Sequence, residues 1–153
     1  MILSTICYIE KDNKYLMLHR TKKENDINKN KWIGVGGKFE EGESPEECII
    51  REVKEETGLT LKEYQLRGIV TYVSTTWETE YMHIFTANEF EGELIECNEG
   101  DLEWIEKDKV MILNTWEGDK LFLEKLLKEE RSFFSIKFEY DGEKLVNYTM
   151  KEY

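Results

Sequence analysis

One stretch with fixed spacings constrains this chain more than any other part of its sequence. It covers residues 37–59 and reads GKFEEGESPEECIIREVKEETGL. Ser44 is a good helix N-cap, a proline follows it at the first helical position, and Glu47 completes a capping box with Ser44. Gly58 supplies the left-handed residue that ends many helices. The sequence therefore predicts a helix over residues 45–57.

Three glutamates of this helix are predicted to share one face. At about 100° per residue, Glu52, Glu55 and Glu56 project together. Their mutual repulsion costs helix stability unless a positive charge neutralises it. All-oxygen ligands of this kind suit a hard cation such as Mg²⁺ or Mn²⁺. A solvated acidic face is the alternative, because Glu is abundant in this chain.

The whole stretch resembles the Nudix box, Gly-x5-Glu-x7-Arg-Glu-(apolar)-x-Glu-Glu-x-Gly-(apolar), at every specified position. The match begins at Gly37 and includes Arg51, which directly precedes the first of the three glutamates. The complete pattern favours the metal site over the solvated face. The chain is similar in this respect to the Nudix hydrolases, which cleave nucleoside diphosphates linked to another moiety.

The fold implied by this resemblance is of the α+β class. It is a Nudix-type α/β/α sandwich around a mixed β-sheet, with the box helix on one face. A chain of 153 residues is most simply one domain, residues 1–153. Apolar, β-prone segments predict strands at residues 2–9, 15–18, 64–75, 81–85, 102–105, 133–140 and 144–148.

Turns and a second helix complete the expected elements. Asp12-Asn13 and Asp141-Gly142 are hairpin signals, and the polar segment 21–31 reads as a mobile loop. A second amphipathic helix is expected over residues 117–130. Leu121 points away from its apolar stripe and needs a separate partner. The stripe itself consists of Phe122, Leu123, Leu126 and Leu127.

Segments outside the box resemble the MutT-type 8-oxo-dGTP diphosphatases. They are residues 32–38 (WIGVGGK), 98–100 (NEG), 115–119 (TWEGD) and 133–138 (FFSIKF). In that comparison Glu99 falls where the family places a further metal-binding or base carboxylate, and Thr5 falls near the nucleotide pocket.

One departure from the family concerns the purine pocket. Some purine-selective members carry Asn where Ile33 stands and two adjacent Asp where Gly118 and Asp119 stand. Asp119 alone then remains to hydrogen-bond a purine edge, in competition with a structural role as a first-turn helix acid. Trp77, in the loop between two predicted strands, either stacks on a base or caps the core.

The resemblance implies a metal-assisted hydrolysis. Arg51 would pin Glu43 or Glu52, and Arg20 and Lys38 would grip the substrate phosphates. Either Glu52 or Glu99 would take the proton from the attacking water. The expected Mg²⁺ ligands, with Mn²⁺ as an alternative metal, are the Gly36 carbonyl and the side chains of Glu52, Glu55, Glu56 and Glu99.

The expected activity is a Mg²⁺-dependent nucleoside triphosphate pyrophosphohydrolase. It would convert 8-oxo-dGTP to 8-oxo-dGMP and pyrophosphate, which sanitises the nucleotide pool and serves DNA repair. Three other substrates stay open: ADP-ribose, a dinucleotide polyphosphate and an ordinary dNTP. A nucleotide-sensing module without turnover is a further alternative, although a pure binder has no need of every box carboxylate.

Charge and cysteine content limit the partners. The net charge of -12 argues against a reader of DNA or RNA polymers, which needs a basic face. A small nucleotide can still bind if metal ions screen its phosphates. The three cysteines Cys7, Cys48 and Cys97 are widely spaced, which fits reduced thiols in a cytoplasmic protein. No apolar stretch reaches membrane length, and both a monomer and a homodimer are compatible with the sequence.

Overall fold

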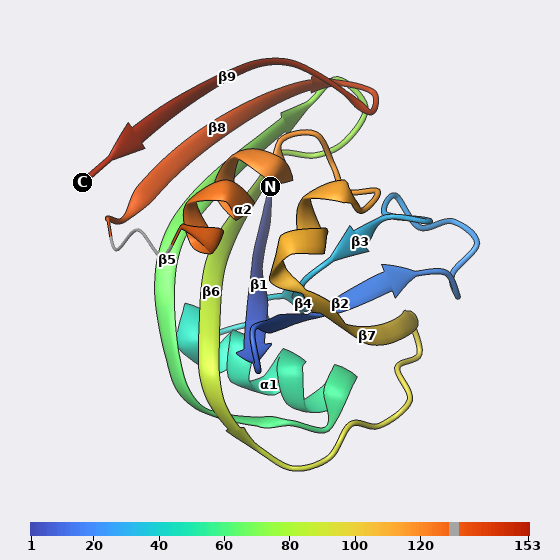
Figure 1. The fold of residues 1–153 in the computed structure, drawn as a ribbon. Helices are drawn as coiled ribbons and strands as arrows, with labels where there is room; N and C mark the ends of the chain where they lie inside the picture. The colour runs from blue at the N-terminus through green and yellow to red at the C-terminus, as the bar shows by residue number, and fades with distance from the viewer. Residues whose placement is uncertain (129–131) are drawn as a thin grey trace.

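The computed structural model describes residues 1–128 and 132–153, which form a curved mixed sheet between two helices (Figure 1). The elements in chain order are β1 (Ile2–Lys11), β2 (Lys14–Arg20), β3 (Trp32–Ile33), β4 (Val35–Lys38), α1 (Pro45–Thr57), β5 (Thr60–Ser74), β6 (Glu80–Glu91), β7 (Gly100–Glu106), the 3₁₀ helix η1 (Lys107–Ile112), α2 (Asp119–Leu127), β8 (Phe134–Asp141) and β9 (Lys144–Glu152).

The sheet mixes parallel and antiparallel neighbours. Its hydrogen-bonded order is β3-β2-β1-β6-β5-β8-β9, with β4 paired to β1 and β7 paired to β2. The β1–β6 and β5–β8 pairs are parallel, and the other pairs are antiparallel. The predicted α/β/α layering around a mixed sheet is therefore confirmed.

Strand β1 lies at the centre of the molecule, and the side chains on both of its faces are buried. Ile6 and Tyr8 join one hydrophobic cluster, which includes the buried residues of α2. Cys7 and Ile9 alternate with them and join a second cluster, which includes Ile49 and Val53 of α1. Since side chains alternate across a strand, the two helices cover opposite faces of the sheet.

Helix α1 has the predicted bounds and the predicted ends. The Ser44 side chain accepts a hydrogen bond from the Glu47 amide, and the Glu47 side chain accepts one from the Ser44 amide. Gly58 ends the helix in the left-handed region, with φ of 82°. Ile49 and Val53 are fully buried against the sheet, and the adjoining glutamate face brings Glu52 against Gly37 of β4.

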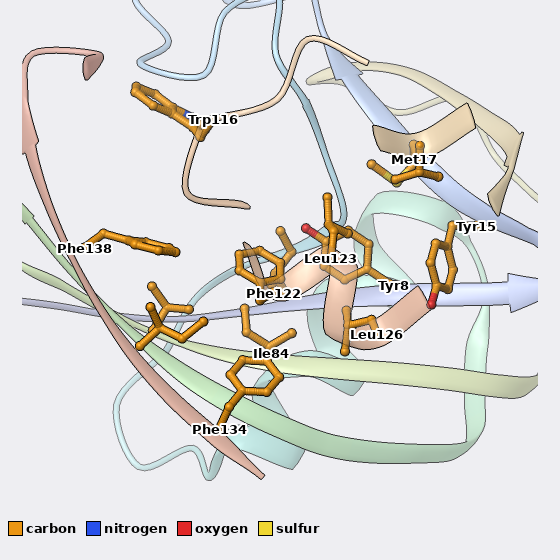
Figure 2. Packing of buried hydrophobic residues seen from close by; sticks show 14 of the residues in the cluster. Tyr8, Tyr15, Met17, Ile84, Trp116, Phe122, Leu123, Leu126, Phe134 and Phe138 are labelled. Carbon is orange, nitrogen blue, oxygen red and sulfur yellow. The ribbon is translucent and has the colours of Figure 1, made fainter. Parts of the chain in front are cut away.

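Helix α2 is shorter than predicted. It begins at Asp119 and ends at Leu127, and the predicted end at residues 129–130 lies outside the described residues. Figure 2 shows the α2 side chains gathered with residues of β1, β6 and β8 in one cluster. The apolar stripe is confirmed, but Leu121 packs partly buried against this same cluster, so the expected separate partner is wrong.

Other differences follow from polar or short segments. Strand β5 begins before residue 64 and β6 extends beyond residue 85, into stretches where exposed polar side chains alternate with the buried Leu61 and Ala87. The glycine-rich residues 32–38 form β3 and β4, which were not predicted, and neither was η1. Both hairpin turns are confirmed, with positive φ at Asp12, Asn13 and Gly142. Within the described part of the chain, no helix is both long and apolar enough to cross a membrane.

Substituting Gly58 by Val should destabilise the fold. The left-handed backbone is costly for a β-branched residue, and a Cβ here would lie 2.7 Å from the Glu93 carbonyl oxygen. Gly42→Val is the matched control, because Gly42 has φ of 80° but open space around its Cβ position. We expect thermal melting to show a larger loss for Gly58→Val than for Gly42→Val, by about 5 °C. Equal melting of the two variants would contradict the tight packing at Gly58.

Candidate active site

Arg51 links the box carboxylates through its guanidinium group. Its Nε and Nη2 atoms donate to the two carboxylate oxygens of Glu43 at 2.7 and 2.8 Å. Nη1 donates to Glu52 at 2.8 Å and to Glu55 at 3.2 Å, and Nη2 also reaches the Lys38 carbonyl at 3.0 Å. The bond from Arg51 lowers the pKa of Glu43 to about 2. Arg51 thus pins both expected carboxylates and neutralises part of the repulsion on this helix face.

Two adjacent glycines let β4 approach the carboxylates closely. A Cβ on Gly37 would lie 2.4 Å from the carboxyl carbon of Glu52, and a Cβ on Gly36 would lie 2.0 Å from the Thr5 carbonyl oxygen. Neither position therefore admits a side chain while Glu52 and β1 stay in place. Figure 1 shows α1 lying next to β4, which brings the helix and this glycine pair together.

Glu56 and Glu99 face each other although they come from different elements. Burial raises the pKa of Glu56, and the neighbouring charge of Glu99 raises it further. Burial would also raise the pKa of Glu99, but the cations of Lys23 and Arg20 outweigh it and lower that pKa. The two carboxyl groups share a hydrogen bond. Protonated Glu56 donates and ionised Glu99 accepts.

The donor set at this place fits a hard divalent cation. Glu56 Oε2 is buried and has no hydrogen-bond partner among the described residues, so it is an oxygen that a cation can satisfy. Glu52 and Glu99 lie close enough to Glu56 to influence its pKa, and Glu55 contacts Arg51 at the exposed side of the face. Across residues 1–128 and 132–153, no three His, Cys, Asp or Glu side chains form a complete ligand cage. A cation held by three of these side chains would require some of them to rotate.

The two expected phosphate contacts occupy different environments. Lys38 is exposed at the end of β4, directly after the glycine pair. Arg20 is mostly covered, and its guanidinium contacts the carboxylates of Asp26 and Glu99, both at 2.6 Å. Lys38 thus faces solvent and follows the glycine pair in sequence, whereas Arg20 is bonded to Glu99.

Thr5 of β1 lies between the glycine pair of β4 and helix α1. Its side chain is buried, its Oγ1 lies 3.3 Å from Cys48 Sγ, and it donates a long hydrogen bond of 3.4 Å to the Gly37 carbonyl. The Cys48 thiol lies 3.7 Å from the same carbonyl. Thr5 and Cys48 therefore connect β1 and α1 to the glycine pair. No sequence pattern singled out Cys48 as a neighbour of the glycine pair, because an isolated cysteine in a helix reads as an ordinary core residue.

Asp119 is buried among aromatic side chains at the start of α2. Burial raises its pKa to about 7, and the Glu80 charge adds to the effect while Lys31 opposes it. Tyr72 stacks on Tyr140 with ring centroids 4.5 Å apart and meets the Trp116 ring edge-on at 5.9 Å. The acidic side chain is thus held in an apolar, aromatic setting in which both protonation states are accessible near neutral pH.

Packing explains why the residue before Asp119 is glycine. A Cβ on Gly118 would lie 2.8 Å from both the Phe138 ring and the Tyr140 hydroxyl oxygen. The Tyr140 hydroxyl also accepts a hydrogen bond of 2.7 Å from the Gly118 amide. Ile33 packs partly buried against the same hydrophobic cluster. In this chain both positions serve packing.

Trp77 lies in the loop between β5 and β6 and is 53% exposed. Among the described residues it belongs to neither hydrophobic cluster, so the alternative that it caps the core is wrong. Sequence reasoning also missed the acidic neighbour of Asp119, Glu80, and the partner of Arg20, Asp26. Both lie in stretches where an isolated acid carries no distinguishing pattern.

Comparison with known proteins adds relatives to this geometry. The family model described as "NUDIX domain" matches residues 2–126. An "Oxidized purine nucleoside triphosphate hydrolase" of Danio rerio is 34% identical over 119 residues, which are 76% of each chain. An "ADP-ribose pyrophosphatase" of Methanocaldococcus jannaschii is 46% identical over 61 residues, but these cover 40% of this chain and 34% of that protein.

A solved structure shares nearly the whole fold. The crystal structure of a Mutator MutT protein from Bacillus halodurans superposes with a TM-score of 0.88 and is 30% identical in sequence. The match covers 99% of this chain and 98% of that one. The similarity therefore includes β8 and β9, which lie beyond the residues matched by the family model.

The substitution Glu56→Gln should abolish stabilisation by divalent cations while the fold is kept. Gln has a similar shape and, like the protonated acid, donates a hydrogen bond to Glu99, but it has no charge to offer a cation. The readout is the rise in melting temperature on adding Mg²⁺ or Mn²⁺. Glu46→Gln, at an exposed position of the same helix, is the control and should keep the full rise. A rise in Glu56→Gln as large as in the wild type would remove Glu56 from the cation site.

Proposed function

The chain belongs to the Nudix family, and from this premise we propose that it is a Mg²⁺-dependent nucleoside triphosphate pyrophosphohydrolase that acts on oxidised purine nucleotides. We also propose that residues 1–153 form a single domain. A substrate such as 8-oxo-dGTP would give 8-oxo-dGMP and pyrophosphate. The observation that carries the choice of a purine is the buried Asp119 carboxyl beside Trp116 and Tyr72.

The proposed cation ligands are one backbone carbonyl of the glycine pair and four glutamate side chains. They are the Gly36 carbonyl and the side chains of Glu52, Glu55, Glu56 and Glu99. When bound, Mg²⁺, or Mn²⁺ in its place, acidifies a water molecule and screens the substrate phosphates. The buried Oε2 of Glu56, which has no hydrogen-bond partner within the described ranges, supports this assignment.

The protein's own groups supply orientation and proton transfer. Glu52 or Glu99 would accept the proton of the attacking water. Arg51 keeps Glu52 in place through its 2.8 Å bond, so Glu52 does not lose orientation as charge develops. Lys38, exposed beside the glycine pair, would bind phosphate oxygens as a point charge.

Asp119 would read the base. As a carboxylate it accepts a hydrogen bond from a purine amino group, and as a carboxylic acid it also donates to a ring carbonyl. Its pKa of about 7, raised by burial, makes both forms accessible in neutral solution. A buried polar group that hydrogen-bonds a substrate rejects analogues lacking the partner, because the group is then left unpaired. Trp77 would contact the nucleotide from the β5–β6 loop, whereas the buried Thr5, bonded toward Cys48 and the Gly37 carbonyl, would act by holding the glycine pair in place.

ADP-ribose is a second candidate substrate, favoured by the local similarity to the pyrophosphatase of Methanocaldococcus jannaschii. We expect kcat/KM with Mg²⁺ to be highest for 8-oxo-dGTP in a panel that also contains dGTP and ADP-ribose, with pyrophosphate as the inorganic product. A preference for ADP-ribose would replace the proposed substrate. No turnover of any member, together with nucleotide binding, would indicate a sensing module.

The substitution Asp119→Ala should reduce kcat/KM for 8-oxo-dGTP about tenfold or more, which corresponds to one lost hydrogen bond to a charged group. Cleavage of inorganic triphosphate, which has no base, should scarcely change. The control is Asp108→Ala, at an exposed position of η1. Equal losses on both substrates, or losses that follow the melting temperature, would assign Asp119 to helix stability. The loop around Trp77 would then be the place to search for base recognition.

A further inference from the structure

Arg20 joins two carboxylates that are far apart in the sequence. Its Nε donates to Asp26 Oδ2 and its Nη1 donates to Glu99 Oε2, both at 2.6 Å. The side chains of Arg20, Asp26 and Glu99 are 13%, 5% and 22% exposed. Charge-assisted bonds of this length between largely covered groups fix the orientation of the planar guanidinium.

The loop that follows β2 is folded so that Asp26 cannot move freely. Asp26 Oδ1 accepts a hydrogen bond of 3.0 Å from the Asn28 amide, and the Asp26 carbonyl accepts one of 3.0 Å from the Lys29 amide. The Asn30 amide returns to the Arg20 carbonyl at 2.7 Å. The end of the loop therefore returns to Arg20, the last residue of β2, and the Asp26 carboxylate is held in a fixed position next to the Arg20 side chain.

Glu99 has no helix or strand of its own to orient it. The loop that carries it is brought to β2 by a bond from the Lys22 amide to the Glu99 carbonyl at 3.3 Å. The next residue, Gly100, pairs with Arg20 in the sheet, and a Cβ there would lie 1.9 Å from the His19 carbonyl oxygen. A glycine at this position is thus required for the close approach of Glu99 to Arg20.

Electrostatic repulsion between carboxylates opposes the placement of Glu99 next to the box helix. Glu99 also lies near the carboxylate of Glu52, and repulsion between these two like charges would drive an unrestrained loop side chain toward solvent. A second cation, Lys23, bonds Glu99 Oε1 at 3.0 Å but is 55% exposed. Lys23 can leave that oxygen at little cost, whereas the covered Arg20 remains bound to the other oxygen.

We propose that Arg20 and Asp26 form a positioning pair that holds Glu99 toward Glu56, so that Arg20 serves the cation site through Glu99 and does not grip phosphate. This inference rests on the proposed function in requiring a cation at the box carboxylates. It also assigns the loop after β2 a part in metal binding. Groups that hydrogen-bond a metal ligand matter because they orient that ligand and tune the affinity for the metal.

The test uses two variants that leave the net charge unchanged. Arg20→Lys keeps the positive charge but removes the guanidinium fork, and Asp26→Glu keeps the negative charge but displaces it by one methylene. Each should weaken Mn²⁺ binding to the nucleotide-free protein about tenfold, as measured by electron paramagnetic resonance well below the melting temperature. Glu24→Asp in the same loop is the control, because Glu24 is 94% exposed and its ion pair with Lys29 is long, at 3.8 Å.

A double-mutant cycle shows whether Arg20 acts through Glu99. In a Glu99→Gln background, Arg20→Lys should cause no further loss of Mn²⁺ affinity, since the group that it positions is already altered. Unchanged Mn²⁺ affinity in Arg20→Lys, combined with a higher KM for the nucleotide, would overturn the inference and make Arg20 a phosphate ligand. A wild-type protein that binds no Mn²⁺ would instead contradict the proposed function itself.

Discussion

The guanidinium of Arg51 is the group on which the arrangement of the site depends. It contacts four carboxylates within 4 Å, those of Glu40, Glu43, Glu52 and Glu55. In a chain of net charge -12, a helix face with three glutamates would otherwise lose stability through repulsion. A planar group with five donors in a fixed fork can bond one carboxylate with two parallel bonds and reach others as well, whereas a lysine ammonium has three donors and no such fork. Arg51 therefore allows the acids to stay together, and in the proposed site the buried oxygen of Glu56 would bind the cation.

The sheet positions the glycine pair and the aromatic group around Asp119 relative to the box helix. Strand β1 is buried on both sides, and through its pairing with β4 it places the glycines beside Glu52. The aromatic group around Asp119 belongs to the cluster on the opposite face of the same strand. A nucleotide whose phosphates lie at the carboxylates and whose base lies at Asp119 would reach both faces of the sheet, which would give the two faces separate chemical tasks.

The sequence predicted the parts that have local signals. The bounds of α1, its capping box and the left-handed Gly58 follow from residues within one or two turns, and all are confirmed. The bond from Arg51 to Glu43 spans eight positions within the box itself. Contacts such as Arg20 to Glu99 and Thr5 to Cys48 depend on how distant strands pair, which no local pattern encodes. Strands β3 and β4 were missed because glycine disfavours strands on average, whereas here the close packing against β1 and Glu52 requires it.

The central claim is that the carboxylate of Glu56, together with Glu52 or Glu99, holds a divalent cation. A crystal structure of the protein with Mn²⁺, analysed by anomalous scattering, tests it most directly. We expect an anomalous peak about 2.0–2.2 Å from a carboxylate oxygen of Glu56, with Glu52 or Glu99 as a further ligand and Arg51 still bonded to Glu43. A peak elsewhere on the protein, with Glu56 still hydrogen-bonded to Glu99, would contradict the claim.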